Sequence, residues 1–160
     1  MIKFSGTLSN KCVIEYSKQT NKANALVFSY FTIFILVVTL TLAFFDTENF
    51  YYLLCLLGIM IIINLTLLFV PPNSVVFKLP RIVEIVDNQI SSATQYENKV
   101  CKSLVKKVNN IKVIVDYGDW YYIRFKFDIT ASVVCQKNLI VEGTIEDFEK
   151  LFADKIIRKY

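Results

Sequence analysis

Residues 25–45 read ALVFSYFTIFILVVTLTLAFF, and residues 50–70 read FYYLLCLLGIMIIINLTLLFV. Neither stretch contains a charged residue. As a helix, each would rise roughly 31 Å, which matches a bilayer hydrocarbon core of about 30 Å. The residues DTEN between them leave room only for a tight turn. We therefore expect two adjacent, antiparallel transmembrane helices, the second ended by the helix-breaking pair Pro71-Pro72.

The charges that flank these stretches predict their orientation. Lysines precede the first stretch, whereas the link between the two carries acids and no cation. Lys78 and Arg81 follow the second stretch. Because cytoplasmic flanks of membrane spans are enriched in Lys and Arg, we expect a multi-pass protein of the cell membrane with both termini in the cytoplasm. Aromatic residues that fit an interfacial belt gather near the expected outer end: Phe44, Phe45, Phe50, Tyr51 and Tyr52.

Few polar residues interrupt the two stretches. They include Thr32, Thr39 and Thr41 in the first and Asn64 and Thr66 in the second. We interpret them as hydrogen-bond glue between the two helices. A transport path would usually need ionisable groups at this depth, so a channel or pump made of one chain is not predicted, while an oligomeric pore stays open.

Composition restricts the chemistry of the remainder. Outside the two stretches the chain forms one small domain at most, too small to bury two helices that are apolar on every side. The chain has no histidine, four scattered cysteines and four glycines, so we expect no enzyme activity, no metal site and no cofactor. The net charge of +4 is modest, which argues against nucleic acid as a partner.

Alternation of apolar and polar residues predicts a cytosolic strand and helix over residues 1–24 and a cytosolic β domain over residues 73–160. A final amphipathic helix is expected over 144–158, capped by Thr144. A helical turn is expected at 103–108. The expected strands cover residues 2–8, 74–79, 81–86, 90–96, 111–116, 120–127 and 132–136. The fold class is thus α+β: a two-helix transmembrane hairpin and a small antiparallel β domain capped by a C-terminal helix.

Two groups of side chains are candidates for contact with lipid or a partner. The first is a run of lysines without an acid: Lys99, Lys102, Lys106, Lys107 and Lys112. Lysines near an anionic membrane surface each contribute about 1 kcal/mol of attraction, but the same run also suits a solvated face. The second group lies on one face of the best strand and is either an exposed aromatic and cationic patch or a second core face: Trp120, Tyr122, Arg124 and Lys126.

The order of the expected elements resembles the YcxB-like membrane proteins of bacteria. The most telling stretch is VVCQKNLIVEGTIEDFEKLF, residues 133–152, which is similar to that family's closing strand and acidic-aromatic helix. Gln136 stands where the family usually has proline, and Leu104 stands where tryptophan is common. The resemblance implies a soluble part similar to bacterial pleckstrin-homology domains, a strongly bent sheet capped by a helix. It implies no catalytic residue.

The sequence therefore favours a membrane-anchored, non-catalytic binding or regulatory module at the inner leaflet. Its expected partners are the lipid bilayer, anionic lipid headgroups, and a membrane protein or a second copy of the chain. Two alternatives remain open. The chain could be an immunity protein whose hairpin and outer turn recognise a toxin or bacteriocin, or it could be an accessory subunit of a membrane complex.

Overall fold

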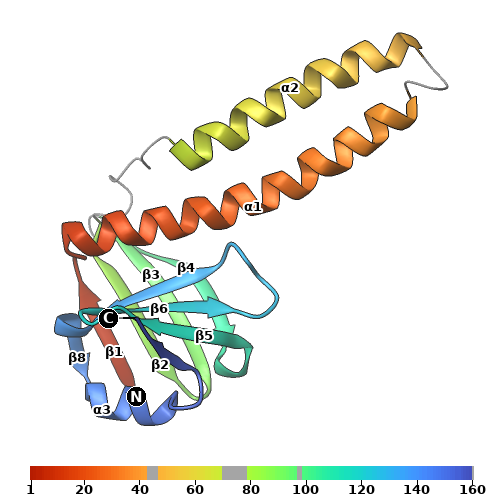
Figure 1. Ribbon diagram of the computed structural model, residues 1–160. Helices are drawn as coiled ribbons and strands as arrows, with labels where there is room; N and C mark the ends of the chain where they lie inside the picture. Colours follow the sequence, from red (N-terminus) through yellow and green to blue (C-terminus); the bar gives the residue numbers. More distant parts are fainter. Residues whose placement is uncertain (43–46, 70–78, 97–98, 160) are drawn as a thin grey trace. The chain divides into compact units, whose positions relative to one another are not determined.

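The computed structural model describes residues 1–42, 47–69, 79–96 and 99–159 of an α+β protein (Figure 1). It divides into two compact units. The β unit is Met1–Ser17 with Asn73–Tyr160, and the helical unit is Lys18–Pro72. Several expected features lie outside the described residues: the acid Asp46, the aromatics at 44 and 45, the stop at Pro71-Pro72, and most of the strand expected at 74–79.

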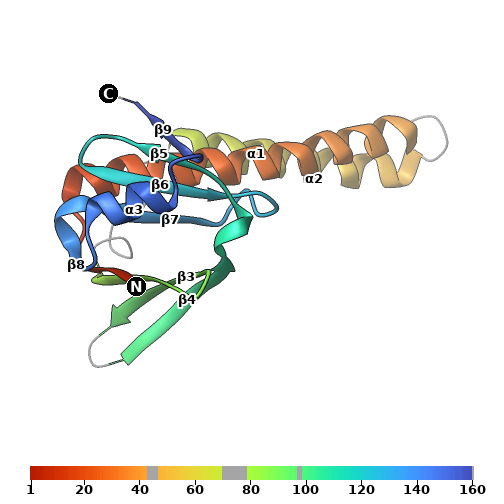
Figure 2. The ribbon, with the colours of Figure 1, turned by 90° about the horizontal axis from the view of Figure 1, so that it is seen from below.

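The β unit contains two sheets, which Figure 2 shows stacked on each other. The first has the order β4-β3-β2-β1-β8, and the second has the order β7-β6-β5-β9. Neighbouring strands are antiparallel except β5 and β9, which are parallel. The strands are β1 (Ile2–Gly6), β2 (Arg81–Val86), β3 (Gln89–Tyr96), β4 (Lys99–Lys107), β5 (Ile111–Asp116), β6 (Trp120–Phe125), β7 (Ser132–Gln136), β8 (Ile140–Glu142) and β9 (Ile156–Arg158).

The main core lies between the two sheets and is closed by helix α3 (Ile145–Leu151). Phe148 of α3 is fully buried, stacks on the Tyr121 ring at 4.6 Å and meets the Phe4 ring edge-on at 5.7 Å. The cap of this helix is confirmed, because the Thr144 hydroxyl accepts a hydrogen bond from the Asp147 amide at 3.1 Å. One short helix therefore ties the second sheet to β1 at the chain's other end.

A second core covers the opposite face of the β5–β6–β7 strands. The first turns of helix α1 (Asn10–Leu42) bury Cys12, Val13 and Tyr16 against Trp120 and Tyr122. The N-terminus of α1 is held from two sides. The Ser9 hydroxyl accepts a hydrogen bond from the Cys12 amide at 3.4 Å, and the Ser9 amide donates to Gln136 Oε1 at 2.8 Å. The second sheet is therefore covered on both faces.

The helical unit contains the rest of α1 and helix α2 (Thr47–Phe69). Asn64 of α2 links the two helices, because its amide nitrogen donates to Thr32 Oγ1 at 2.8 Å and its amide oxygen accepts from Ser29 Oγ at 3.2 Å. The interpretation as interhelical glue is confirmed for these residues. Hydroxyls of three other threonines instead donate to the carbonyl four residues earlier in their own helix: Thr39, Thr41 and Thr66.

Among the described residues, one helix is long and apolar enough to cross a membrane, Asn10–Thr41, and a shorter apolar helix covers Phe50–Thr66. In the most apolar window of the first, only 11% of the residues are buried. A core helix of a soluble protein would be mostly buried. The apolar surface of α1 is therefore unusual for a chain surrounded by water on all sides.

Four expectations about secondary structure are wrong. The strand expected at 2–8 ends at Gly6. Residues 103–108 form no helical turn, because β4 continues to Lys107 and is followed by a 3-10 turn at Val108–Asn110. The final helix does not reach residue 158, because α3 ends at Leu151 and Ile156–Arg158 pair with β5. The strand expected at 120–127 ends at Phe125. The last three differences accompany the pairing of β4 with β3, the pairing of β9 with β5, and the hydrogen bond from the Lys126 amide to the Asn110 carbonyl.

Candidate lipid-facing surface

The two aromatic residues of the candidate patch on β6 are buried. Trp120 is 3% exposed and Tyr122 is 4% exposed. Trp120 stacks on the Tyr117 ring at 4.3 Å, and Tyr122 meets the Tyr16 ring of α1 at 6.0 Å. The second-core alternative is therefore confirmed for both residues, and neither is available to a membrane surface.

The lysines of β4 do not form one patch. β4 is an edge strand paired with β3, and a register shift opposite Ser92 and Ala93 interrupts the pairing. Lys106 lies opposite the fully buried Ile90 and forms an ion pair with Asp128 at 3.2 Å. Lysines on an edge strand discourage pairing with further chains, which is a sufficient structural reason for them. The exposed members are Lys99, Lys102 and Lys107.

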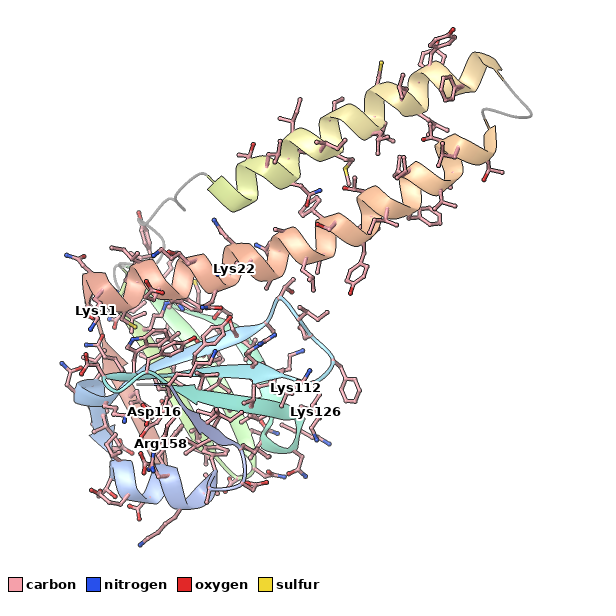
Figure 3. All side chains as sticks on the ribbon, in the orientation of Figure 1. Lys11, Lys22, Lys112, Asp116, Lys126 and Arg158 are labelled. Atoms are coloured by element: carbon pink, nitrogen blue, oxygen red, sulfur yellow. The ribbon has the colours of Figure 1, made fainter. Side chains whose placement is uncertain are left out.

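Three cations from neighbouring strands come together instead, and we call Lys112, Arg124 and Lys126 the cationic corner. Arg124 pairs with Val113 across the strands, and Lys112 is the extra residue where the β5–β6 register shifts. The Lys126 amide donates to the Asn110 carbonyl at 2.8 Å. Figure 3 shows Lys112 and Lys126 at the same end of this strand pair.

All three side chains of the cationic corner are exposed. Within the part of the chain that the structure describes, none of them forms an ion pair, whereas Lys106 and Lys137 have carboxylate partners. Arg124 is the last but one residue of β6 and Lys126 follows directly after the strand, so the two cations are two residues apart in the chain and reinforce each other's positive potential. The corner therefore offers uncompensated positive charge at one place on the surface.

The loop after β6 adds apolar groups beside this corner. Phe127 is at the alternate position after Phe125, where a continuing strand would point both side chains the same way, but Phe127 is 89% exposed, and Ile129 is 46% exposed. Asp128 between them holds the loop: its Oδ1 accepts hydrogen bonds from the Ala131 amide and the Thr130 hydroxyl, both at 3.0 Å. Aspartate favours turns because its side chain accepts hydrogen bonds from nearby backbone and hydroxyl groups, so Asp128 is the sequence signal available for this loop.

A second cluster of charged groups lies at the other end of the β unit, near α3. The Tyr121 hydroxyl donates to Glu149 at 2.7 Å, and Arg158 pairs with the same carboxylate at 3.2 Å. Hydrogen bonding by Tyr121 holds the pKa of Glu149 below its usual value, and burial raises the pKa of Tyr121. Neither group titrates near neutral pH, so the pair is poorly suited to general acid-base catalysis.

Beside this cluster is an open hollow of about 450 Å³, lined by Glu146, Glu149, Lys150, Ala153, Ile156 and Arg158. Its best-placed charges, Glu149 and Arg158, already pair with each other. Nearby, the buried carboxylate of Asp116 pairs with Lys137 at 3.0 Å and accepts a hydrogen bond from the Gly118 amide at 2.9 Å. Together these bonds connect β6 to α3, α3 to β9, and β5 to the segment after β7, which is a structural task.

No protein-family model, no curated protein and no solved structure matches this chain. Function is therefore inferred from the chain's own residues. The Glu149 and Asp116 carboxylates near α3 have ion-pair partners, whereas the cations of the corner have no carboxylate partner among the described residues and the Phe127 ring is exposed. The corner and its neighbouring loop are therefore the candidate functional surface of the β unit.

Proposed function

We propose that this protein is a membrane-anchored, non-catalytic binding module whose β unit works at the cytoplasmic face of the cell membrane. The observation that carries the proposal is α1. Its first turns are part of the β unit's second core, and its continuation exposes large apolar side chains on several sides: Tyr30, Phe31, Ile33, Phe34, Val37 and Leu40. A bilayer would cover such a surface.

Residues buried in the β unit precede the apolar part of α1, which argues against a cleaved signal sequence. Removal of the apolar helix by a signal peptidase would also remove β1, which pairs with β2, and Val13, which is 1% exposed. The remaining chain would lose contacts in both cores. An anchor that stays attached explains why core residues precede the apolar segment.

We take α2 as the second membrane span, because its 23 residues would rise about 35 Å. It too exposes large apolar side chains, among them Tyr52, Ile59 and Ile62. The basic residues before residue 25 and the acids in the link support cytoplasmic termini. The chain would then be multi-pass, with the β unit, proposed to be pleckstrin-homology-like, on the cytoplasmic side.

The β unit would stay close to the bilayer in this arrangement. Only residues 18–24 lie between Ser17, the last residue of the N-terminal part of the β unit, and the apolar stretch. Seven residues span at most about 25 Å even when fully extended. The proposed ligand class is therefore one that is met at the membrane surface, lipid headgroups first.

Alkaline carbonate extraction of membranes from expressing cells tests the anchor. We expect the wild-type chain to stay in the membrane pellet. A Phe34→Lys/Val37→Lys variant should be extracted or degraded, because two charges at the middle of a span cost about 5–7 kcal/mol. A Gln19→Lys/Asn21→Lys variant adds the same charge to the same helix before the apolar stretch and should stay in the pellet. Release of the wild-type chain as a monodisperse protein without detergent would contradict the proposal.

A further inference from the structure

The loop between β6 and β7 presents an unusual combination of groups. Within three residues, Phe127 and Ile129 place apolar side chains in solvent while Asp128 between them is turned to the protein by three partners. Phe127 is 89% exposed, which is high for an aromatic residue in a folded domain. The cationic corner of Lys112, Arg124 and Lys126 lies beside the start of this loop.

The loop is held in shape before any ligand binds. Asp128 Oδ2 bonds to Lys106 Nζ at 3.2 Å, which fixes the loop to β4, and Oδ1 closes the turn onto Ala131. The outward direction of Phe127 is therefore a feature of an ordered turn. Binding through an ordered loop loses less conformational entropy than binding through a loop that must first be ordered.

The chemistry of these groups fits an anionic bilayer surface. Lysine and arginine side chains bind lipid phosphates, and aromatic and aliphatic side chains enter the boundary between headgroups and acyl chains. A single exposed apolar residue would need no explanation. Here two of them stand beside three cations that have no carboxylate partner among the described residues. A soluble acidic protein would match the charges alone. A bilayer surface matches the charges and also takes up the apolar side chains of Phe127 and Ile129.

We propose that the β6–β7 loop docks the β unit onto anionic lipid, with Phe127 and Ile129 entering the interfacial layer and the cationic corner binding the phosphates. This inference deepens the proposed function and depends on it, because the helical anchor brings the β unit to the surface. It replaces the buried pair Trp120 and Tyr122 of the sequence-based patch with an exposed pair a few residues later.

The test uses the full chain in lipid nanodiscs. A Cys55→Ala/Cys101→Ser background removes the exposed thiols and keeps the buried Cys12 and Cys135. An environment-sensitive fluorophore is placed at Ile129→Cys, and quenching by brominated lipid is measured in discs with neutral lipid alone and with added phosphatidylglycerol. We expect blue-shifted emission and quenching in the anionic discs. A label at Asn138→Cys, an exposed site beyond the end of β7 that lies away from the loop, should remain unquenched.

Charge reversal supplies a matched pair of variants. Lys112→Glu/Arg124→Glu/Lys126→Glu should abolish the quenching, since each cation contributes about fivefold to surface binding and the three together roughly 100-fold. Lys99→Glu/Lys102→Glu/Lys107→Glu makes the same change of net charge on β4 and should leave the quenching in place. Equal loss in both triple variants would show general electrostatic attraction and would overturn the assignment to the corner.

The outcomes separate this inference from the proposed anchor. If the chain enters nanodiscs and resists extraction but the label at residue 129 stays in water in anionic discs, the anchor stands and the docking loop is wrong. If the chain does not enter nanodiscs at all, the proposed function itself fails. Near-ultraviolet circular dichroism of each variant confirms that the β unit is folded.

Discussion

Val13 offers the sharpest test of the second core. Its side chain is 1% exposed and packs with Trp120 and Tyr122, whereas its neighbour Ile14 on the same helix is 53% exposed. Val13→Ala removes two methyl groups, about 1.6 kcal/mol of burial, and leaves a cavity. Alanine's better helix propensity returns about 0.5 kcal/mol. We therefore expect a net loss of about 1–2.5 kcal/mol in the free energy of unfolding.

Trp120 provides the assay, because it is the chain's single tryptophan and lies in the same core. Urea titration in mild detergent, followed by tryptophan emission, gives the free energy for wild type, Val13→Ala and Ile14→Ala. The matched control Ile14→Ala should change it by less than about 0.5 kcal/mol, as is usual for exposed positions. If the two variants lost equal stability, or if Val13→Ala lost none, the start of α1 would not belong to the core of the β unit.

Three further predictions use the same protein. Asp116→Ala should cost about 3 kcal/mol in urea titrations because it leaves the Lys137 ammonium without its partner, and a loss under about 0.5 kcal/mol would refute the pairing. Hydrogen bonds to Asp128, the strongest from Lys106, hold the pKa of Asp128 below its ordinary value. The ionised carboxylate therefore stabilises the fold at a pH above the ordinary pKa, and this contribution is lost as the pH falls through the lowered pKa of the folded state. The difference in the free energy of unfolding between wild type and Asp128→Asn should accordingly be largest at neutral pH and should vanish in strong acid. A difference that acid does not change would contradict this role of Asp128. Burial raises the pKa of Cys12 to about 12 and also raises that of Cys135, so a maleimide should modify Cys101 in the folded protein and reach these two only after denaturation, as mass spectrometry of the labelled chain would show.

Local patterns were sufficient where strands are regular and turns are tight. β2 and β5 have the predicted limits, and the turn at Asp87 and Asn88 has both residues at positive φ, as a two-residue hairpin requires. The cap at Thr144 followed from a short-range hydrogen bond. In these places the deciding interaction lies within a few residues in the sequence.

The errors come from pairings that a segment's own residue pattern does not reveal. Residues 99–108 contain apolar positions at both strand and helix spacing, and pairing with β3 decides for a strand. β9 forms because Ile156 finds a parallel partner in Ile114 of β5. Alternation on β6 defined two faces correctly but could not show that α1 covers one of them.

The candidate site was predicted only in part for the same reason. Arg124 and Lys126 were singled out together, and the structure adds Lys112 to them through the register of β5. Phe127 is not among the site residues that the sequence predicts, because the alternation of Tyr121, Ile123 and Phe125 extends to it within the expected strand 120–127. The turn held by Asp128 ends the alternation and leaves the ring in solvent.

The central claim is that α1 crosses a bilayer and holds the β unit on the cytoplasmic side. A membrane-impermeant maleimide applied to intact cells tests it most directly. With Cys55 replaced by alanine, Cys101 of β4 should be protected in intact cells and modified after lysis, while an added Asp46→Cys should be modified from outside. Modification of Cys101 in intact cells at the rate seen after lysis would contradict the account.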